Sequence, residues 1–277
     1  MNILITGGEG YLGSFIAKSL TPRYNVITLG KSELNITHKE KTLSTIEVLK
    51  PDFIIHCAAL KDVDFCENHE TEAYTVNTIG TLNVASACSA LDIPIIYIST
   101  NEIYDGRKNS PYSEADECNP LNVYGKTKLA GENLIRTLCK KFFIVRTSCV
   151  FGGENFYIKE NLMNFNFPMN NALEEVVSPT YIDDLCQAID NMINSDLYGI
   201  YNCSNKNYCS KAQVIETLFS YLHIENPLVK VRNDKSLIAP RPKFTAFNTS
   251  LIKEVFNLEL PPWEDRLYEY VRKNAYN

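Results

Sequence analysis

The chain has 277 residues, 45% of them hydrophobic, enough to bury a sizeable core in one compact unit or in a large domain with a smaller partner. This composition excludes a long disordered chain and a collagen-like repeat. Lys and Arg number 27 against 33 Asp and Glu, a net charge of −6, which argues against a nucleic-acid surface as the main partner but leaves a local basic pocket open.

The first half of the chain alternates short apolar runs with longer amphipathic ones, as repeated βα units do. Strands are expected at residues 2–6, 25–29, 53–57, 93–99 and 142–146, which are nearly continuous in Ile, Val and Phe, as strands buried on both faces are. Helices are expected between them at 11–20, 39–49, 70–90 and 123–138. The alternation predicts an α/β fold of the Rossmann type, a doubly wound parallel sheet with right-handed crossovers.

After about Phe151 the pattern loosens into a polar stretch rich in Asn. A helical run at 181–195, a strand at 199–202, a helix at 210–222 and, beyond several prolines, a helix at 263–274 follow. We therefore expect residues 1–150 to form the doubly wound domain and 151–277 mainly a smaller, irregular domain. The segment at about 178–198 is expected to pack back on the first domain.

The nine cysteines include no Cys-x-x-Cys pair, and the N-terminus has no charged region followed by a long apolar stretch. No apolar run approaches the roughly 18 residues that span a bilayer, and the four histidines have no metal-ligand spacing. The chain is expected to be soluble and cytoplasmic, with reduced thiols, no membrane contact and no structural metal. The oligomeric state stays open, with a homodimer as one candidate.

Glycine is scarce, yet four of the 12 glycines fall between Gly7 and Gly13. The segment Thr6-Gly-Gly-Glu-Gly-Tyr-Leu-Gly13 follows the first expected strand and opens the first expected helix. Such a turn lets a pyrophosphate approach the backbone N–H groups and positive dipole of a helix N-terminus. Although the bare pattern is often an ordinary turn, this context predicts a dinucleotide site.

The end of the second strand distinguishes NAD from NADP, because an acidic residue there binds the ribose 2′-hydroxyl and repels a 2′-phosphate. This chain has Gly30-Lys-Ser32 there, and no carboxylate before Glu33. Lys31 is placed to pair with a phosphate, so NADPH is favoured and NADH is the alternative. A solvated loop lysine is the competing interpretation of Lys31.

Tyr124 and Lys128 lie four residues apart on an expected helix, so both project from one face. A nearby ammonium and a cationic nicotinamide ring would favour tyrosinate and lower the pKa of the phenol, making Tyr124 a proton donor or acceptor. Such pairs are also common on helix surfaces. This pair gains weight because the strand at 93–99 delivers Ser99 and Thr100 to the sheet edge where ligands of open parallel sheets bind.

The glycine loop, Ser99-Thr100 and Tyr124/Lys128 resemble the extended short-chain dehydrogenase/reductases, and longer segments resemble the dTDP-4-dehydrorhamnose reductase family. The segments are Ile98-Ser-Thr-Asn-Glu-Ile-Tyr-Asp-Gly106, Asn119-Pro-Leu-Asn-Val-Tyr-Gly-Lys-Thr-Lys-Leu-Ala-Gly-Glu132, Arg146-Thr-Ser-Cys-Val-Phe-Gly152 and Pro179-Thr-Tyr-Ile-Asp-Asp-Leu185. The resemblance extends to Arg241-Pro242 and Leu260-Pro-Pro-Trp263, and so covers essentially the whole chain.

The resemblance implies reduction of a 4-keto-6-deoxy sugar attached to a nucleoside diphosphate, with an NAD(P)-binding first domain and a substrate-binding second domain. Thr100 would hydrogen-bond the keto oxygen, Tyr124 would protonate it, and Lys128 would hold the nicotinamide ribose. Donors aimed at an oxygen that develops negative charge stabilise the transition state more than the ground state. The implied cofactor-binding residues are Gly7, Gly10, Tyr11, Leu12, Gly13, Lys31, Asn35, Ile36, Ala58, Ala59, Leu60, Tyr124 and Lys128. The implied substrate-binding residues are Thr100, Asn101, Glu102 and Cys149.

This chain departs from the family pattern in the expected substrate region. The family usually has Asp-Tyr where Asn101-Glu102 stands, and Trp where Cys149 stands. The sugar or the base is therefore free to differ from the family's usual substrate. Cys149 is interpreted as a small packing residue rather than a reactive thiol.

Two other function classes stay open. Sugar-nucleotide dehydratases of the superfamily carry Thr-Asp-Glu at 100–102, but the amide of Asn101 cannot titrate, while Glu102 keeps epimerase chemistry open. The epimerase-reductase type that makes GDP-fucose uses a later histidine, and none occurs between His69 and His223. A non-catalytic, cofactor-binding regulatory member of the superfamily is the alternative outside catalysis.

Overall fold

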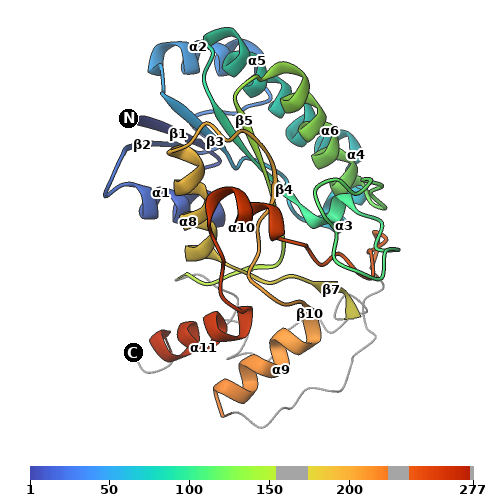
Figure 1. Ribbon diagram of the computed structural model, residues 1–277. Helices are drawn as coiled ribbons and strands as arrows, with labels where there is room; N and C mark the ends of the chain where they lie inside the picture. Colours follow the sequence, from blue (N-terminus) through green and yellow to red (C-terminus); the bar gives the residue numbers. More distant parts are fainter. Residues whose placement is uncertain (154–173, 224–236, 275–277) are drawn as a thin grey trace.

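The computed structural model describes residues 1–153, 174–223 and 237–274, in three layers with a smaller lower part (Figure 1). The Asn-rich stretch expected after Phe151 falls largely outside the described residues.

A six-stranded parallel sheet forms the middle layer, in the order β2-β1-β3-β4-β5-β9. This confirms the predicted doubly wound sheet. The strand bounds are β1 Asn2–Thr6, β2 Asn25–Leu29, β3 Phe53–His56, β4 Ile95–Thr100, β5 Phe142–Thr147 and β9 Gly199–Asn202.

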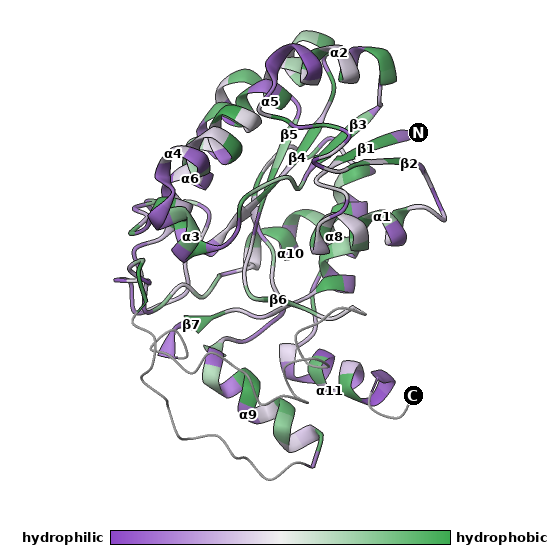
Figure 2. Cartoon of the chain, turned by 180° about the vertical axis from the view of Figure 1, so that it is seen from behind, coloured by the Kyte–Doolittle hydropathy of each residue, from purple (hydrophilic) through white to green (hydrophobic). Residues whose placement is uncertain are grey.

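Helices cover both faces of the sheet, and alternate residues of β1 show the division. Leu4 faces a core with α2 (Lys39–Leu49), α5 (Thr81–Leu91) and α6 (Val123–Leu138). Ile3 and Ile5 face the other core, which is built with α1, α8 and α10. These helices span Tyr11–Leu20, Ile182–Ile193 and Ser250–Phe256. Figure 2 shows hydrophobic residues concentrated along the central strands, as burial on both faces requires.

The chain direction across the sheet reverses at β1, which has β2 on one side and β3 on the other. The loops that leave β1 and β3 therefore diverge and open a crevice at the carboxyl ends of the strands, where doubly wound sheets bind ligands. The glycine loop follows β1 and residues 57–62 follow β3, so both border this crevice.

The smaller part holds α9 (Lys211–Tyr221) and α11 (Trp263–Asn274), which lie below the sheet in Figure 1 and share an apolar core around Trp263 and Leu267. Two short strand pairs accompany them. These pairs are β6 (Val150–Phe151) with β8 (Thr180–Tyr181), and β7 (Val176–Val177) with β10 (Cys209–Ser210).

The helix expected at 70–90 is divided in the structure. It consists of α4 (Glu70–Tyr74), a π-helical turn η1 (Thr75–Gly80) and α5, and the unpredicted helix α3 (Val63–Asn68) precedes it. Wide turns of this kind occur mostly inside α-helices and often near functional sites. The expected strand at 93–99 instead begins at Ile95 and ends at Thr100, where the 3₁₀ turn η2 (Asn101–Ile103) follows.

Candidate active site

The glycine loop makes a tight turn between β1 and α1. Gly7 has φ +69°, and its carbonyl accepts a hydrogen bond from the backbone N–H of Gly10 at 3.0 Å. A Cβ at Gly13 would lie 2.4 Å from the Gly7 oxygen, so the first turn of α1 packs directly on the loop. Bare backbone thus surrounds the positive end of α1, which fits the pyrophosphate of a dinucleotide.

Residues 58–60, expected beneath the cofactor, are held by one buried amide. Asn77, in the π-helical turn, accepts from the backbone N–H of Leu60 at 2.7 Å and donates to its carbonyl at 3.0 Å. The same amide donates to the hydroxyl of Thr127 on α6 at 3.0 Å. Asn77 therefore joins this loop to the helix that carries Tyr124 and Lys128.

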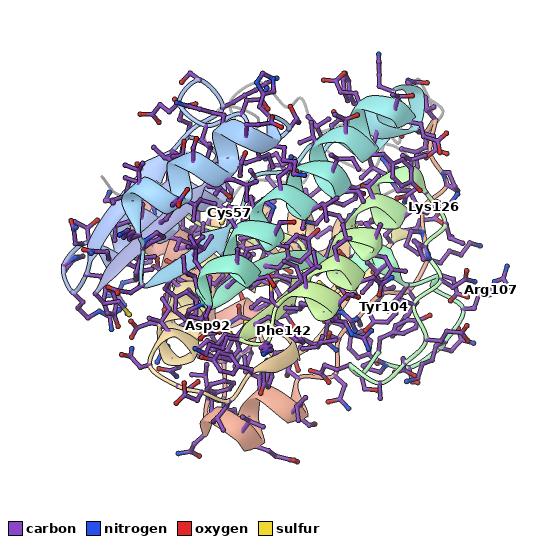
Figure 3. All side chains as sticks on the ribbon, turned by 90° about the horizontal axis from the view of Figure 1, so that it is seen from above. Cys57, Asp92, Tyr104, Arg107, Lys126 and Phe142 are labelled. Atoms are coloured by element: carbon purple, nitrogen blue, oxygen red, sulfur yellow. The ribbon has the colours of Figure 1, made fainter. Side chains whose placement is uncertain are left out.

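A cavity of about 400 Å³ opens at the carboxyl ends of the strands, between the glycine loop and α6. Its lining brings together residues that the sequence predicted for both cofactor and substrate. These predicted residues are Gly7, Gly10, Tyr11, Leu12, Gly13, Ala59, Thr100, Asn101, Tyr124, Lys128 and Cys149. Cys57, another lining residue, follows β3 and is half-buried; in the view of Figure 3 it lies near the middle of the molecule, whereas Arg107 lies at the edge.

The pKa of Tyr124 is raised, whereas a lowered value was predicted from the nearby ammonium. Burial in the cavity wall raises the pKa, the hydroxyl of Thr100 hydrogen-bonds Tyr124 and opposes the shift, and the charge of Glu102 adds to it. Lys128 does not lower the pKa of Tyr124 as predicted, because spacing on a helix does not reveal desolvation. The contribution predicted for a cationic nicotinamide ring stays a prediction. The phenol of Tyr124 is consequently protonated at neutral pH, as a proton donor must be.

Lys128 is buried, with its side chain over the ring of Tyr97. Burial lowers the pKa of Lys128 to about 7, although the nearby carboxylate of Glu132 acts in the opposite direction. The amine is therefore only partly charged near neutral pH. A ribose hydroxyl in the cavity would find in it a hydrogen-bonding partner in either protonation state.

Glu132 forms a buried ion pair behind the site. Its carboxylate lies 2.7 Å from a terminal nitrogen of Arg146 and also accepts from the hydroxyl of Ser99. Arg146 donates in addition to the hydroxyl of Tyr104 at 2.8 Å. These contacts join α6 to β4 and β5 and so hold Lys128, which α6 carries, in position relative to the sheet.

Asn101 and Glu102, where the chain departs from the family pattern, both have hydrogen-bonding partners. The amide of Asn101 donates to the hydroxyl of Thr245 at 2.6 Å. The carboxylate of Glu102 accepts from the amide of Asn122 at 2.8 Å, and Asn122 also caps α6 through the backbone N–H of Gly125. Glu102 thus supports the start of α6, while Asn101 lines the cavity.

Ser148 and Cys149, which follow β5, also line the cavity. Cys149 has φ +43°, and burial raises the pKa of its thiol, in agreement with a packing role and against a reactive thiolate. The hydroxyl of Ser148 is buried and has no hydrogen-bonding partner among the described residues. A buried hydroxyl without a partner, in the same cavity as the glycine loop, fits a polar ligand such as a sugar or the carboxamide of a nicotinamide.

The remaining predicted residues lie off the cavity lining. Lys31 is exposed. The side chain of Asn35 accepts a hydrogen bond from the backbone N–H of Thr37 at 3.2 Å, and Ile36 is buried in the core that Leu4 of β1 faces. Ala58 and Leu60 belong to the loop held by Asn77. The outlying residues, with Glu102 already described, are Lys31, Asn35, Ile36, Ala58 and Leu60.

Sequence reasoning missed Ser148, Lys61 and Asn77. Ser148 follows the carboxyl end of β5, and the same rule that singled out Ser99 and Thr100 after β4 would have found it. Lys61 lines the cavity and lies 5.8 Å from the centre of the Tyr11 ring. Asn77 gave no signal, because a lone amide in a helical run does not reveal what it contacts.

The family model described as RmlD substrate binding domain matches residues 1–276. The chain belongs to this family. It is 34% identical to a dTDP-4-dehydrorhamnose reductase from Aggregatibacter actinomycetemcomitans, over 96% of each chain. It is 31% identical to the reductase of the same name from Sinorhizobium fredii, over 96% of this chain and 95% of the relative. The resemblance inferred from the motifs is confirmed.

The fold of this RmlD-family chain matches a solved structure of dTDP-4-dehydrorhamnose reductase from Bacillus anthracis, in complex with NADP. The TM-score is 0.91 and the identity 32%, over 99% of each chain. Over residues 1–153, 174–223 and 237–274 no helix is long and apolar enough to cross a membrane. The same residues contain no cluster of three or more His, Cys, Asp or Glu side chains suited to a metal ion.

Proposed function

We propose that this protein reduces the 4-keto group of a nucleoside-diphosphate 4-keto-6-deoxy sugar to an alcohol. The observation that carries the proposal is that Thr100, Tyr124 and Lys128 share one cavity with the glycine loop. A reduced nicotinamide cofactor, with its pyrophosphate against that loop, would supply the hydride. The names of the relatives support a dTDP-linked substrate, so thymine is the nucleotide base to test first.

Tyr124 is the proton donor in this proposal. Its raised pKa keeps the phenol protonated until the keto oxygen becomes basic, and Thr100 stands beside it to donate a second hydrogen bond to that oxygen. The carbonyl carbon gains a hydride, the oxygen gains the proton of Tyr124, and solvent returns that proton. Two donors at one developing oxyanion stabilise the transition state more than the substrate.

Residues 1–150 would bind the cofactor, and residues 151–277 would bind most of the sugar nucleotide. Lys31 and the NADP complex of the Bacillus anthracis relative support NADPH as the cofactor. The nine free cysteines are consistent with a cytoplasmic protein, and the net charge of −6 argues against a nucleic-acid partner.

The test is oxidation of NADPH or NADH, followed by nicotinamide absorbance, with a panel of dTDP-, UDP- and GDP-linked 4-keto-6-deoxy sugars. Product analysis gives the base and the stereochemistry together. If a cofactor binds but no substrate of the panel is reduced, the non-catalytic regulatory alternative replaces this proposal. Removal of water from the sugar without net cofactor oxidation would indicate a dehydratase instead.

Tyr124→Phe tests the assigned acid. We expect kcat to fall by about 10²–10⁴-fold while cofactor binding stays measurable, because the variant loses the proton donor and keeps the rest of the cofactor site. Tyr268→Phe is the matched control, since Tyr268 is exposed on α11, away from the cavity. Retained turnover in the Tyr124 variant would remove Tyr124 from its role.

A further inference from the structure

The side chain of Glu9, in the glycine loop, lies against Gly30 at the carboxyl end of β2. A Cβ added to Gly30 would lie 2.0 Å from the carboxyl carbon of Glu9 and 2.1 Å from one of its oxygens. The missing side chain of Gly30 therefore leaves the space that the Glu9 carboxylate occupies. Ser32 donates a hydrogen bond to the other oxygen of that carboxylate at 3.4 Å.

A second carboxylate lies at the same backbone position. Glu33 accepts a hydrogen bond from the backbone N–H of Gly30 at 2.9 Å. Gly30 thus has acidic side chains from two loops beside it. Lys31, Glu9 and Glu33 are all exposed, so water and salt screen their three charges alike. The contacts of Glu9 and Glu33 at Gly30 are what place the two carboxylates at this position.

This position decides between the two nicotinamide cofactors in doubly wound sheets. The end of the second strand meets the adenosine ribose, where a carboxylate accepts a hydrogen bond from a free 2′-hydroxyl and repels a 2′-phosphate. The residue that follows β2 in this chain is a glycine, which led the sequence to favour NADPH. In the structure, the carboxylate of Glu9 in the glycine loop occupies the position that an acidic side chain at residue 30 would take.

We propose that Glu9 is the residue that selects the cofactor, and that it makes this protein prefer NADH to NADPH. The inference rests on the dinucleotide site of the proposed function but not on the identity of the sugar. Glu9 would accept the hydrogen bond of the 2′-hydroxyl. Glu33 would add negative charge that opposes a 2′-phosphate.

Binding measurements test this without any sugar substrate. Dissociation constants of NADH and NADPH are measured by nicotinamide fluorescence, and those of ADP and adenosine 2′,5′-bisphosphate by calorimetry, for the unaltered protein and for Glu9→Gln. We expect the unaltered protein to bind NADH about tenfold more tightly than NADPH, and Glu9→Gln to reduce this ratio about tenfold. The two adenosine fragments should follow the same order.

Three variants sharpen the test. Glu9→Lys should reverse the preference, because an ammonium beside the adenosine ribose would attract the 2′-phosphate of NADPH. Glu47→Gln, which removes a carboxylate from the exposed side of α2, should leave the ratio unchanged. Lys31→Gln separates the two interpretations, because a loss of NADPH affinity in this variant alone would make Lys31 the selecting residue.

Tighter binding of NADPH by the unaltered protein, or an unchanged ratio in Glu9→Gln, would overturn the inference. Failure to bind either dinucleotide would overturn it together with the proposed cofactor site. If NADH binds with a preference that depends on Glu9 but reduces no keto sugar, the inference stands and only the proposed reductase activity fails.

Discussion

The amine nitrogen of Lys128 lies 4.0 Å from the centre of the Tyr97 ring, and the Tyr97 hydroxyl donates to the backbone carbonyl of Lys128 at 3.3 Å. The ring is fully buried, so one side of the amine faces an apolar surface rather than water. An ammonium gains some attraction from the aromatic face but loses more in hydration, which explains its lowered pKa.

This burial makes the stability of the protein depend on pH. The pKa of Lys128 is about 7 in the folded protein against an ordinary value of 10.5, so between these values the unfolded chain holds a proton that the folded chain lacks. Stability contributed by this residue therefore rises with pH across that window. Lys128→Met removes the effect and should be more stable than the unaltered protein by about 1 kcal/mol or more near pH 8, with a clearly smaller gain near pH 10 that vanishes only above the ordinary pKa of 10.5.

Urea unfolding at the two pH values measures this difference. Lys126→Met is the control, because Lys126 is exposed on the same helix (Figure 3), and its difference from the unaltered protein should not change with pH. A stability difference for Lys128→Met that is flat across the window would contradict the lowered pKa.

The ion pair of Glu132 and Arg146 predicts a large loss on breaking one side of it. Both side chains are almost completely buried, at 1% and 3% exposure. Glu132→Gln leaves the guanidinium without a counter-charge and should lower the free energy of unfolding by about 3–5 kcal/mol. The double variant with Arg146→Met should lie closer to the unaltered protein than Glu132→Gln does, and a larger loss in the double variant would argue against the pairing.

Gly13→Ala tests the contact between α1 and the glycine loop. Alanine is normally better than glycine inside a helix by about 1 kcal/mol, but here its Cβ would lie 2.4 Å from the Gly7 carbonyl oxygen. The clash should dominate, so we expect weaker dinucleotide binding and a lower Tm. Gly199→Ala, whose nearest contact would be an ordinary 3.4 Å, is the control and should bind the cofactor normally.

The hydrogen bond from Asn101 to Thr245 predicts a defect confined to the sugar nucleotide. Thr245→Val keeps the shape but leaves the buried Asn101 amide without its acceptor, which costs about 1–3 kcal/mol. We expect a higher KM for the sugar nucleotide and an unchanged dissociation constant for the cofactor, with Thr245→Ser close to the unaltered protein. An equal loss in cofactor binding would show that Thr245 supports the whole cavity instead.

Much of the sheet could be predicted because its strands are defined locally. The bounds of β1 and β2 agree with the expected ones, since continuous apolar runs between turn residues show in the sequence itself. The two-residue strands β6 and β7 were not predicted. They exist only because β8 and β10, distant in sequence, lie beside them.

The candidate site divides in the same way. The glycine loop and the Tyr124/Lys128 pair have fixed spacing and were recognised. The direction of the Tyr124 pKa shift depends on burial, and the place of Glu9 depends on how two loops meet. Both the pKa shift of Tyr124 and the position of Glu9 depend on contacts between segments that are distant in sequence, so neither could be predicted without the structure.

The last strand of the central sheet has a consequence for synthesis of the chain. β9 covers β5 at the sheet edge, and Leu258 and Leu260 complete the core against which Ile3 and Ile5 pack. The face of the sheet that carries Ile3 and Ile5 therefore stays partly uncovered until the residues around Leu258 and Leu260 have been made. A chain that ends before these residues exposes apolar surface, which is the property that makes incompletely folded chains prone to aggregate.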